Sequence, residues 1–160
     1  MRNFKKDESG SAVICRSITE VYCVDKNYKG DVIIPMGATD IVDHAFQDCG
    51  GIKSVVIPNT VTRIGEEAFM GCSGIKSIVI PDSVTDIDIG AFTGCTALTT
   101  VITGTGIEHI SDLSFRDCSA LTAFYGYADT YTAKFAGENG YYFEALPEKK
   151  TEETEIVATN

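Results

Sequence analysis

The sequence predicts a solenoid of short parallel β-strands, in which coils of 23 residues stack along one axis. Two residue types show the period, because phenylalanine and cysteine each recur with this step at Phe46, Phe69, Phe92 and Phe115 and at Cys49, Cys72, Cys95 and Cys118. A third observation is that the Ile-Pro pairs starting at Ile34, Ile57 and Ile80 keep the same step. A repeat this short cannot bury its own apolar residues, so it buries them against its neighbours in a stack.

Each copy carries an aliphatic version of the pattern Leu-x-x-Leu-x-Leu, as in Ile52-x-x-Val55-x-Ile57 and Ile75-x-x-Ile78-x-Ile80. The full phrase reads VVIPNTVTRIGEEAFMGCSGIKS in one copy and IVIPDSVTDIDIGAFTGCTALTT in the next. From Val32 to Leu146 the chain resembles the BspA-like family, the bacterial surface-antigen type of leucine-rich repeat. We therefore expect a right-handed leucine-rich-repeat solenoid with two short parallel ladders, a short helical turn in each coil and a cap at each end.

Within one coil, the strand of the first ladder ends at the proline, because Pro81 cannot donate a ladder hydrogen bond. The alternation of side chains along a strand points Ile78 and Ile80 inward and Val79 outward. A second ladder is expected over Val84–Ile87, followed by a helical turn around Phe92 that buries its ring. Glycine or aspartate then occupies a position that favours a left-handed backbone, at Asp48, Gly71, Gly94 and Asp117.

The repeat phrase also divides the chain. Residues 1–10 are expected to be a flexible N-terminus, and 11–31 an N-terminal cap with strands at 12–14 and 21–24. Residues 32–123 form four repeats, of which the last is degenerate, with Thr103-Gly104 in place of Ile-Pro and Ser114 in place of alanine. Residues 124–146 are expected to close the array with a helix over 130–137 and a strand over 141–146, and 147–160 to be a disordered tail.

Composition limits the partners. The chain of 160 residues is 44% apolar and 22% charged, as globular domains are, and its formal net charge of −10 argues against binding nucleic acid or an anionic membrane. No apolar run is long enough for membrane insertion. The N-terminal residues MRNFKKDESG lack the apolar stretch of a signal peptide. The family resemblance implies a cell-surface or secreted protein, and the N-terminus leaves a cytoplasmic location as the alternative.

The cysteines at the repeat position are expected to be small buried apolar residues. Neighbouring parallel strands lie about 4.8 Å apart, whereas the Cβ atoms of a disulfide lie about 3.5–4.5 Å apart. A row of thiols also does not form the tetrahedron that zinc prefers. Cys15 and Cys23 lie outside this column, and a disulfide between them is left open.

The sequence gives no reason to expect an enzyme or a cofactor. His44 and His109 fall at different positions of the repeat, and neither aligns with a serine or cysteine that it might activate. Adjacent carboxylates such as Glu66 and Glu67 are expected to form a solvated face. A column of charged residues on the second ladder, formed by Asp40, Arg63, Asp86 and His109, is expected to place Arg63 between the two aspartates as a structural ion pair.

The candidate partner-binding site is an outward row on the first ladder, flanked by Lys53 and Lys76. We call this row the apolar stripe, and it consists of Ile33, Val56, Val79, Ile102 and Tyr125. A contiguous exposed apolar row marks a protein partner site, on the face that leucine-rich-repeat proteins generally use for binding. The alternative is that β-branched residues simply suit a pleated surface. Under the first interpretation, the family resemblance implies cell adhesion or attachment to host or matrix proteins.

A second candidate site is the aromatic C-terminal region. Clustered tyrosines can bind sugars as amphipathic platforms, so the residues Tyr125, Tyr127, Tyr131, Tyr141 and Tyr142 raise the possibility of a carbohydrate-binding module. The alternative is that these bulky residues cover the last coil of the stack.

Overall fold

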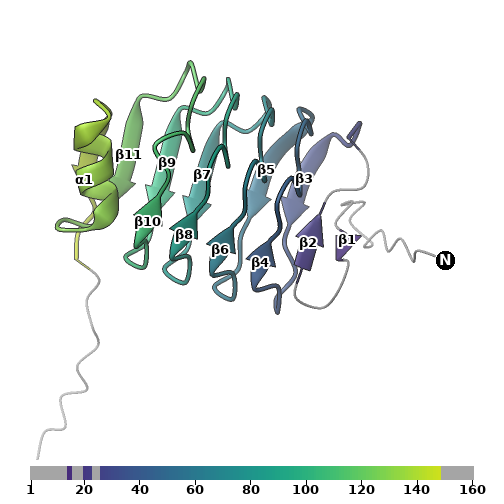
Figure 1. Ribbon diagram of the computed structural model, residues 1–160, viewed down its shortest axis with the longest axis horizontal. Helices are drawn as coiled ribbons and strands as arrows, with labels where there is room; N and C mark the ends of the chain where they lie inside the picture. Colours follow the sequence, from purple (N-terminus) through teal and green to yellow (C-terminus); the bar gives the residue numbers. More distant parts are fainter. Residues whose placement is uncertain (1–13, 16–19, 23–25, 149–160) are drawn as a thin grey trace, which may run out of the picture.

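In the computed structural model, the chain is a stack of β-coils with two ladders that run side by side along the stack (Figure 1). The structure describes residues 14–15, 20–22 and 26–148, the first two of these segments by their backbone only. The segment expected to be a flexible N-terminus and most of the segment expected to be a tail lie outside the described residues, and so does Cys23, whose pairing with Cys15 was left open. The predicted parallel solenoid with a 23-residue period is confirmed.

The first ladder is made of the longer strands. They are β3 (Gly30–Ile33), β5 (Ile52–Val56), β7 (Ser77–Ile80), β9 (Thr100–Thr103), β11 (Ala123–Gly126) and β12 (Tyr142–Ala145). The second ladder is made of β1 (Ile14–Cys15), β2 (Glu20–Tyr22), β4 (Asp40–Ile41), β6 (Arg63–Ile64), β8 (Asp86–Ile87) and β10 (His109–Ile110). Each strand of the second ladder from β4 onward is limited to two residues, so it is shorter than the span 84–87 expected from the sequence.

The register follows the period. Ile64 lies opposite Ile87 and Val79 opposite Ile102, so residues 23 apart in sequence become neighbours on adjacent coils. The second ladder is parallel from β2 to β10, and β1 closes its N-terminal end with an antiparallel pair. In the part of the chain that the structure describes, the first ladder is divided, because β3 pairs only with β5 while β7, β9, β11 and β12 form a separate sheet.

Each coil closes through tight turns where a helical turn was expected. Around Phe69, for example, the N–H of Cys72 donates to the carbonyl of Phe69, and the N–H of Ala68 donates to Gly65. The expected left-handed position is confirmed, with φ of 61° at Asp48 and 72° at Gly71. A second left-handed column was not foreseen and includes His44 and Glu67, with φ of 58° and 51°.

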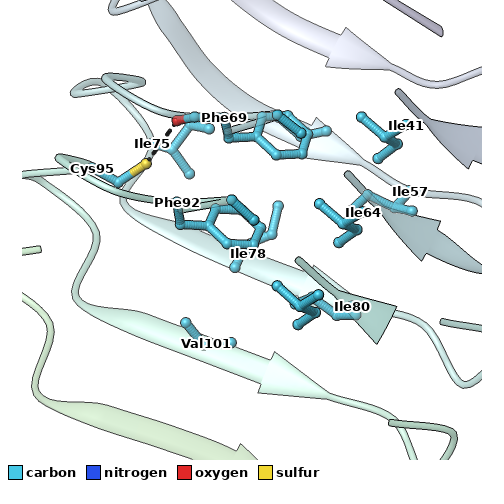
Figure 2. Close-up of a cluster of buried hydrophobic side chains, with 14 of the residues drawn as sticks. Ile41, Ile57, Ile64, Phe69, Ile75, Ile78, Ile80, Phe92, Cys95 and Val101 are labelled. Carbon is cyan, nitrogen blue, oxygen red and sulfur yellow. Dashed lines mark hydrogen bonds between the residues drawn. The ribbon is translucent and has the colours of Figure 1, made fainter. Parts of the chain in front are cut away.

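The core is a set of columns in which successive coils contribute identical or similar side chains (Figure 2). The rings of Phe46, Phe69, Phe92 and Phe115 stack nearly parallel, with centroids 5.0, 5.3 and 5.2 Å apart along the column. Figure 2 shows Phe69 above Phe92, with Ile64 of the second ladder and Ile78 of the first beside them. The inward assignment of the Phe column is therefore confirmed.

The cysteine column is buried and free of disulfides, as expected. The thiols also have a role that the sequence did not reveal. Cys72, Cys95 and Cys118 each donate a hydrogen bond to a phenylalanine carbonyl of the preceding coil, at sulfur–oxygen distances of 3.1, 3.1 and 3.0 Å. The bond from Cys95 to Phe69 is drawn in Figure 2. These carbonyls already accept a backbone N–H from their own coil, so the thiol supplies a second hydrogen bond that links neighbouring coils and gives the buried S–H an acceptor.

The C-terminal unit consists of α1 (Tyr131–Glu138) and β12, which stands at the edge of the first ladder. Thr130 caps the helix by accepting a hydrogen bond from the N–H of Ala133. The helix places the ring of Phe135 5.9 Å from that of Phe124. Of the described residues, none belongs to a helix with the length and apolarity that a membrane crossing requires.

The fourth repeat departs from the common phrase at Thr103 and Ser114, and both side chains make hydrogen bonds inside the fold. Thr103, which takes the repeat position of Ile80, is 2% exposed and donates a hydrogen bond of 3.0 Å to the buried hydroxyl of Thr132 on α1. Ser114 is likewise buried and donates to the carbonyl of Asp88 at 2.8 Å. Both departures from the repeat thus introduce polar groups whose hydrogen bonds are satisfied inside the fold.

Candidate interaction surface

The apolar stripe lies on the outward face of the first ladder, one residue from each strand between β3 and β11. Ile33, Val56 and Val79 are 51%, 56% and 56% exposed. Ile102 and Tyr125 are half-buried. The stripe is therefore most exposed in its N-terminal part and becomes more covered toward the C-terminal unit.

The stripe is not the uniform row that the period alone suggested. Ile33 lies opposite Val56 in one sheet, and Val79, Ile102 and Tyr125 lie opposite one another in the next. Within the described residues no ladder pairing joins β5 to β7, although the two strands pack beside each other. The expectation of one continuous sheet face is thus wrong at this step, and the stripe consists of two segments.

The two flanking lysines are exposed, as a partner-binding role requires. Lys53 lies near the amino end of β5, and Lys76 directly precedes β7. Between each lysine and the stripe lies a row of small polar residues that includes Ser54 and Ser77. Ser54 donates a hydrogen bond of 2.6 Å to Asp31, so part of this row is tied to the neighbouring strand.

At the other end of the strands the structure shows a surface hollow of about 350 Å³ that the sequence did not predict. Its lining includes Val79 and Ile102 of the stripe, Asp82 in the turn after β7, and Tyr127 and Leu146 of the C-terminal unit. The remaining lining residues are Ile57, Asn59, Ile80, Pro81, Thr103 and Gly104. The stripe is thus continuous with a depression at the carboxyl ends of β7, β9 and β11.

The five C-terminal tyrosines occupy different surroundings. Tyr127 lines the hollow, and Tyr131 on α1 faces His109 with ring centroids 6.4 Å apart. Tyr141 packs against Phe124 with centroids 5.0 Å apart, and burial raises the pKa of its hydroxyl. Tyr142, by contrast, is 61% exposed on β12. Part of the cluster therefore covers the last coil, and part of it remains at the surface.

The charged column on the second ladder has the expected register but not the expected ion pairs. Arg63 lies opposite Asp40 and Asp86 along the ladder. Its guanidinium instead binds Asp43, at 2.7 Å, and Asp88, both located in the turns that follow the strands. The hydrogen bond from Arg63 lowers the pKa of Asp43, and the backbone N–H of Glu66 adds to this effect. The prediction failed because an arginine side chain reaches past its own ladder position.

The two histidines, His44 and His109, lie in different surroundings. His44 lies 3.3 Å from a carboxylate oxygen of Glu67, which also accepts a hydrogen bond from Gln47. His109 is exposed at the end of the second ladder. Glu66 is exposed, whereas Glu67 is half-buried, so the two neighbouring glutamates point in different directions.

A comparison with models of known protein families identifies the family that has this architecture. The family model described as BspA type leucine-rich repeat region matches residues 17–134 in six copies. The chain belongs to this family. The match to the BspA-type repeat begins within the segment expected to be the N-terminal cap and ends within α1. The first of these ends agrees with the parallel pairing of β2 and β4, which extends the second ladder into that segment.

Solved structures show the same fold for the BspA-type chain. A leucine-rich cell surface protein of Faecalibacterium prausnitzii matches with a TM-score of 0.55 at 22% identity, over 81% of this chain and 38% of its own. A leucine-rich repeat protein of Eubacterium ventriosum gives 0.53 at 22%, over 75% and 34%. One from T. pallidum gives 0.54 at 19%, over 77% and 67%. The chain thus spans little more than a third of the first two proteins, and no curated protein matches it.

Proposed function

We propose that this BspA-type repeat protein is a non-enzymatic protein-interaction module that attaches to host or matrix proteins through the apolar stripe. The family points to an interaction or adhesion role, and one of the similar structures carries the name of a cell surface protein. The observation that carries the proposal is the exposure of Ile33, Val56 and Val79 by more than half on one face. We propose a cell-surface or secreted location on the same grounds.

The energetics favour a partner that covers the stripe and its surroundings together. Fully burying an aliphatic side chain is worth about 1.5–3 kcal/mol, so covering a half-exposed valine is worth roughly 1 kcal/mol. Three such residues do not by themselves overcome the cost of association. Lys53 and Lys76 at one end of the strands and the hollow at the other supply further contacts. An interface of ordinary size would therefore extend over the whole outward face of β5, β7 and β9.

The test is binding of the purified chain to a panel of matrix and host-surface proteins. The variant Val56→Asp/Val79→Asp places two charges on the stripe, and we expect it to abolish binding while far-ultraviolet circular dichroism remains unchanged. The matched control is Ile89→Asp/Leu113→Asp, which makes the same chemical change at residues that are 45% and 43% exposed away from the first ladder. Equal binding by the wild type and the stripe variant would refute the proposed site.

A carbohydrate-binding module is the second candidate function, and the exposure of Tyr142 on the edge strand favours it. In this case, a glycan array would show binding that is lost in Tyr142→Ala and kept in the stripe variant. Tyr141 serves as a poor probe, because its ring packs against Phe124 and its removal would disturb the core.

A further inference from the structure

Two lysines occupy a repeat position where other coils carry a residue that links one coil to the next. Lys53 and Lys76, which we call the lysine pair, take the position of Thr99 and Thr122 in the later coils. Each of these threonines donates its hydroxyl to a carbonyl of the preceding coil, Thr99 to Lys76 at 3.0 Å and Thr122 to Thr99 at 3.4 Å. A lysine has no hydroxyl, so the lysine pair gives up this link between coils.

The lysine pair also brings two like charges together. Lys53 lies in β5 and Lys76 directly precedes β7, and these two strands pack beside each other. Neighbouring parallel strands lie about 4.8 Å apart, and like charges at such positions are destabilising. Among the described residues, no carboxylate forms an ion pair with either lysine. An anion held between the two ammonium groups would remove this repulsion, so the position favours binding rather than folding.

The charges around the lysine pair are strongest on its own two coils. On the preceding coil, the exposed Lys29 passes so close to Gly51 that a Cβ atom there would lie 2.8 Å from the Cγ of Lys29. Asp31 offsets this charge, because it stands on the same strand and its carboxylate accepts a hydrogen bond of 2.6 Å from Ser54. The positive charge without a nearby carboxylate is therefore centred on the lysine pair.

The cationic region is short along the stack. The repeat position of the lysine pair is uncharged on both sides, with Gly30 before it and Thr99 after it. A long polyanion would extend beyond the pair onto a protein whose net charge of −10 repels it. Two acidic residues of a protein segment fit better, because alternate side chains of an extended peptide lie about 6.6 Å apart. The flexible four-carbon stems of the lysines allow their ammonium groups to reach that spacing.

We propose that Lys53 and Lys76 bind two carboxylates of an acidic segment of the partner protein. This assignment rests on the proposed protein-interaction function and adds to it the chemistry of the partner. A row of small polar residues separates the lysine pair from the stripe. The partner therefore presents acidic side chains at the amino ends of β5 and β7 and aliphatic side chains on Val56 and Val79, which gives the interface a direction.

The probe is a pair of synthetic peptides, acetyl-Gly-Glu-Gly-Glu-Gly-amide and the same peptide with glutamine in place of glutamate, titrated into the ¹⁵N-labelled chain and followed by NMR. The glutamate peptide should shift the amide signals of Lys53, Ser54, Lys76 and Ser77, and the glutamine peptide should bind more weakly. Because the contact is electrostatic and exposed, added salt should weaken binding of the glutamate peptide and leave that of the glutamine peptide unchanged.

The test variant is Lys76→Thr, in which we expect the affinity for the glutamate peptide to fall about two- to fivefold. This variant preserves the fold, because threonine occupies the equivalent position at Thr99 and donates a hydrogen bond there. The matched control is Arg116→Thr, which also exchanges one exposed cation for the threonine of an equivalent position, that of Thr93. Arg116 lies between β10 and β11, so the control should bind the glutamate peptide as the wild type does.

Equal affinity for both peptides, or an unchanged affinity in Lys76→Thr, would overturn the assignment. The assignment would also be wrong if neither peptide bound and a heparin oligosaccharide bound the wild type but not Lys76→Thr, because the ligand would then be a sulfated glycan. The proposed function is tested separately by the stripe variant Val56→Asp/Val79→Asp. If this variant loses binding to a matrix protein while the two peptides bind the wild type equally, the stripe stands and the acidic partner does not.

Discussion

Replacing Phe69 by alanine tests the stacked core most directly. Phe69 is fully buried, and its ring lies 5.0 Å from that of Phe46 and 5.3 Å from that of Phe92. Truncating a buried phenylalanine typically costs about 3–5 kcal/mol, and each stacked ring pair accounts for about 0.5–1.5 kcal/mol of such a cost. Because two pairs are lost from the middle of a column, we expect a value in the upper part of this range.

The assay is thermal unfolding followed by circular dichroism. For a chain of this size, 1 kcal/mol corresponds to about 2–4 °C in Tm, so a loss of 4–5 kcal/mol lowers Tm by about 8–20 °C. The control is Phe143→Ala, which removes a half-buried ring on the edge strand β12 and should cost markedly less. If Phe69→Ala lowered Tm no more than Phe143→Ala, the argument that burial between neighbouring coils stabilises the stack would fail.

Two further predictions concern polar groups. Thr103→Val should cost about 1–3 kcal/mol, because it leaves the buried Thr132 hydroxyl without its donor, whereas Thr103→Val/Thr132→Val should restore most of that loss in urea unfolding. Arg63→Met should lower stability at pH 7 by about 1 kcal/mol or less, since its partners Asp43 and Asp88 are partly exposed. The folded-state pKa of Asp43 lies below its ordinary value of 3.8, so its contribution is present above that value and is lost as the pH falls through the folded-state pKa. The difference between wild type and Arg63→Met should therefore shrink at pH 3, and a difference that is independent of pH would contradict this account.

Arg63 shows which contacts the 23-residue period predicts and which it does not. The period placed its Cα atom opposite Asp40 and Asp86 correctly. The guanidinium then bound carboxylates in the turns, where two aspartates from different coils converge. Backbone register follows from the repeat, but the partner of a long side chain depends on rotamers that the repeat does not specify.

The cysteine column shows a similar division. Its burial followed from the period, because a residue type repeated at one position in a stack of small coils faces the core. The hydrogen bonds from the thiols to phenylalanine carbonyls depend on the twist and offset between coils, and only the structure revealed them.

By itself the sequence determined the 23-residue period, the parallel register and the inward columns, since each coil must bury its apolar residues against an almost identical neighbour. The direction in which Ile33, Val56 and Val79 point followed from strand alternation. Only the tertiary structure decided that the first ladder divides between β5 and β7, and that the hollow forms where Tyr127 and Leu146 meet the stripe. The hollow arises where the repeat gives way to the C-terminal unit, because there the packing of unlike neighbours replaces the translation of one coil onto the next. The division between β5 and β7, by contrast, falls between two nearly identical copies, so it is a property of the folded ladder and not of the repeat phrase.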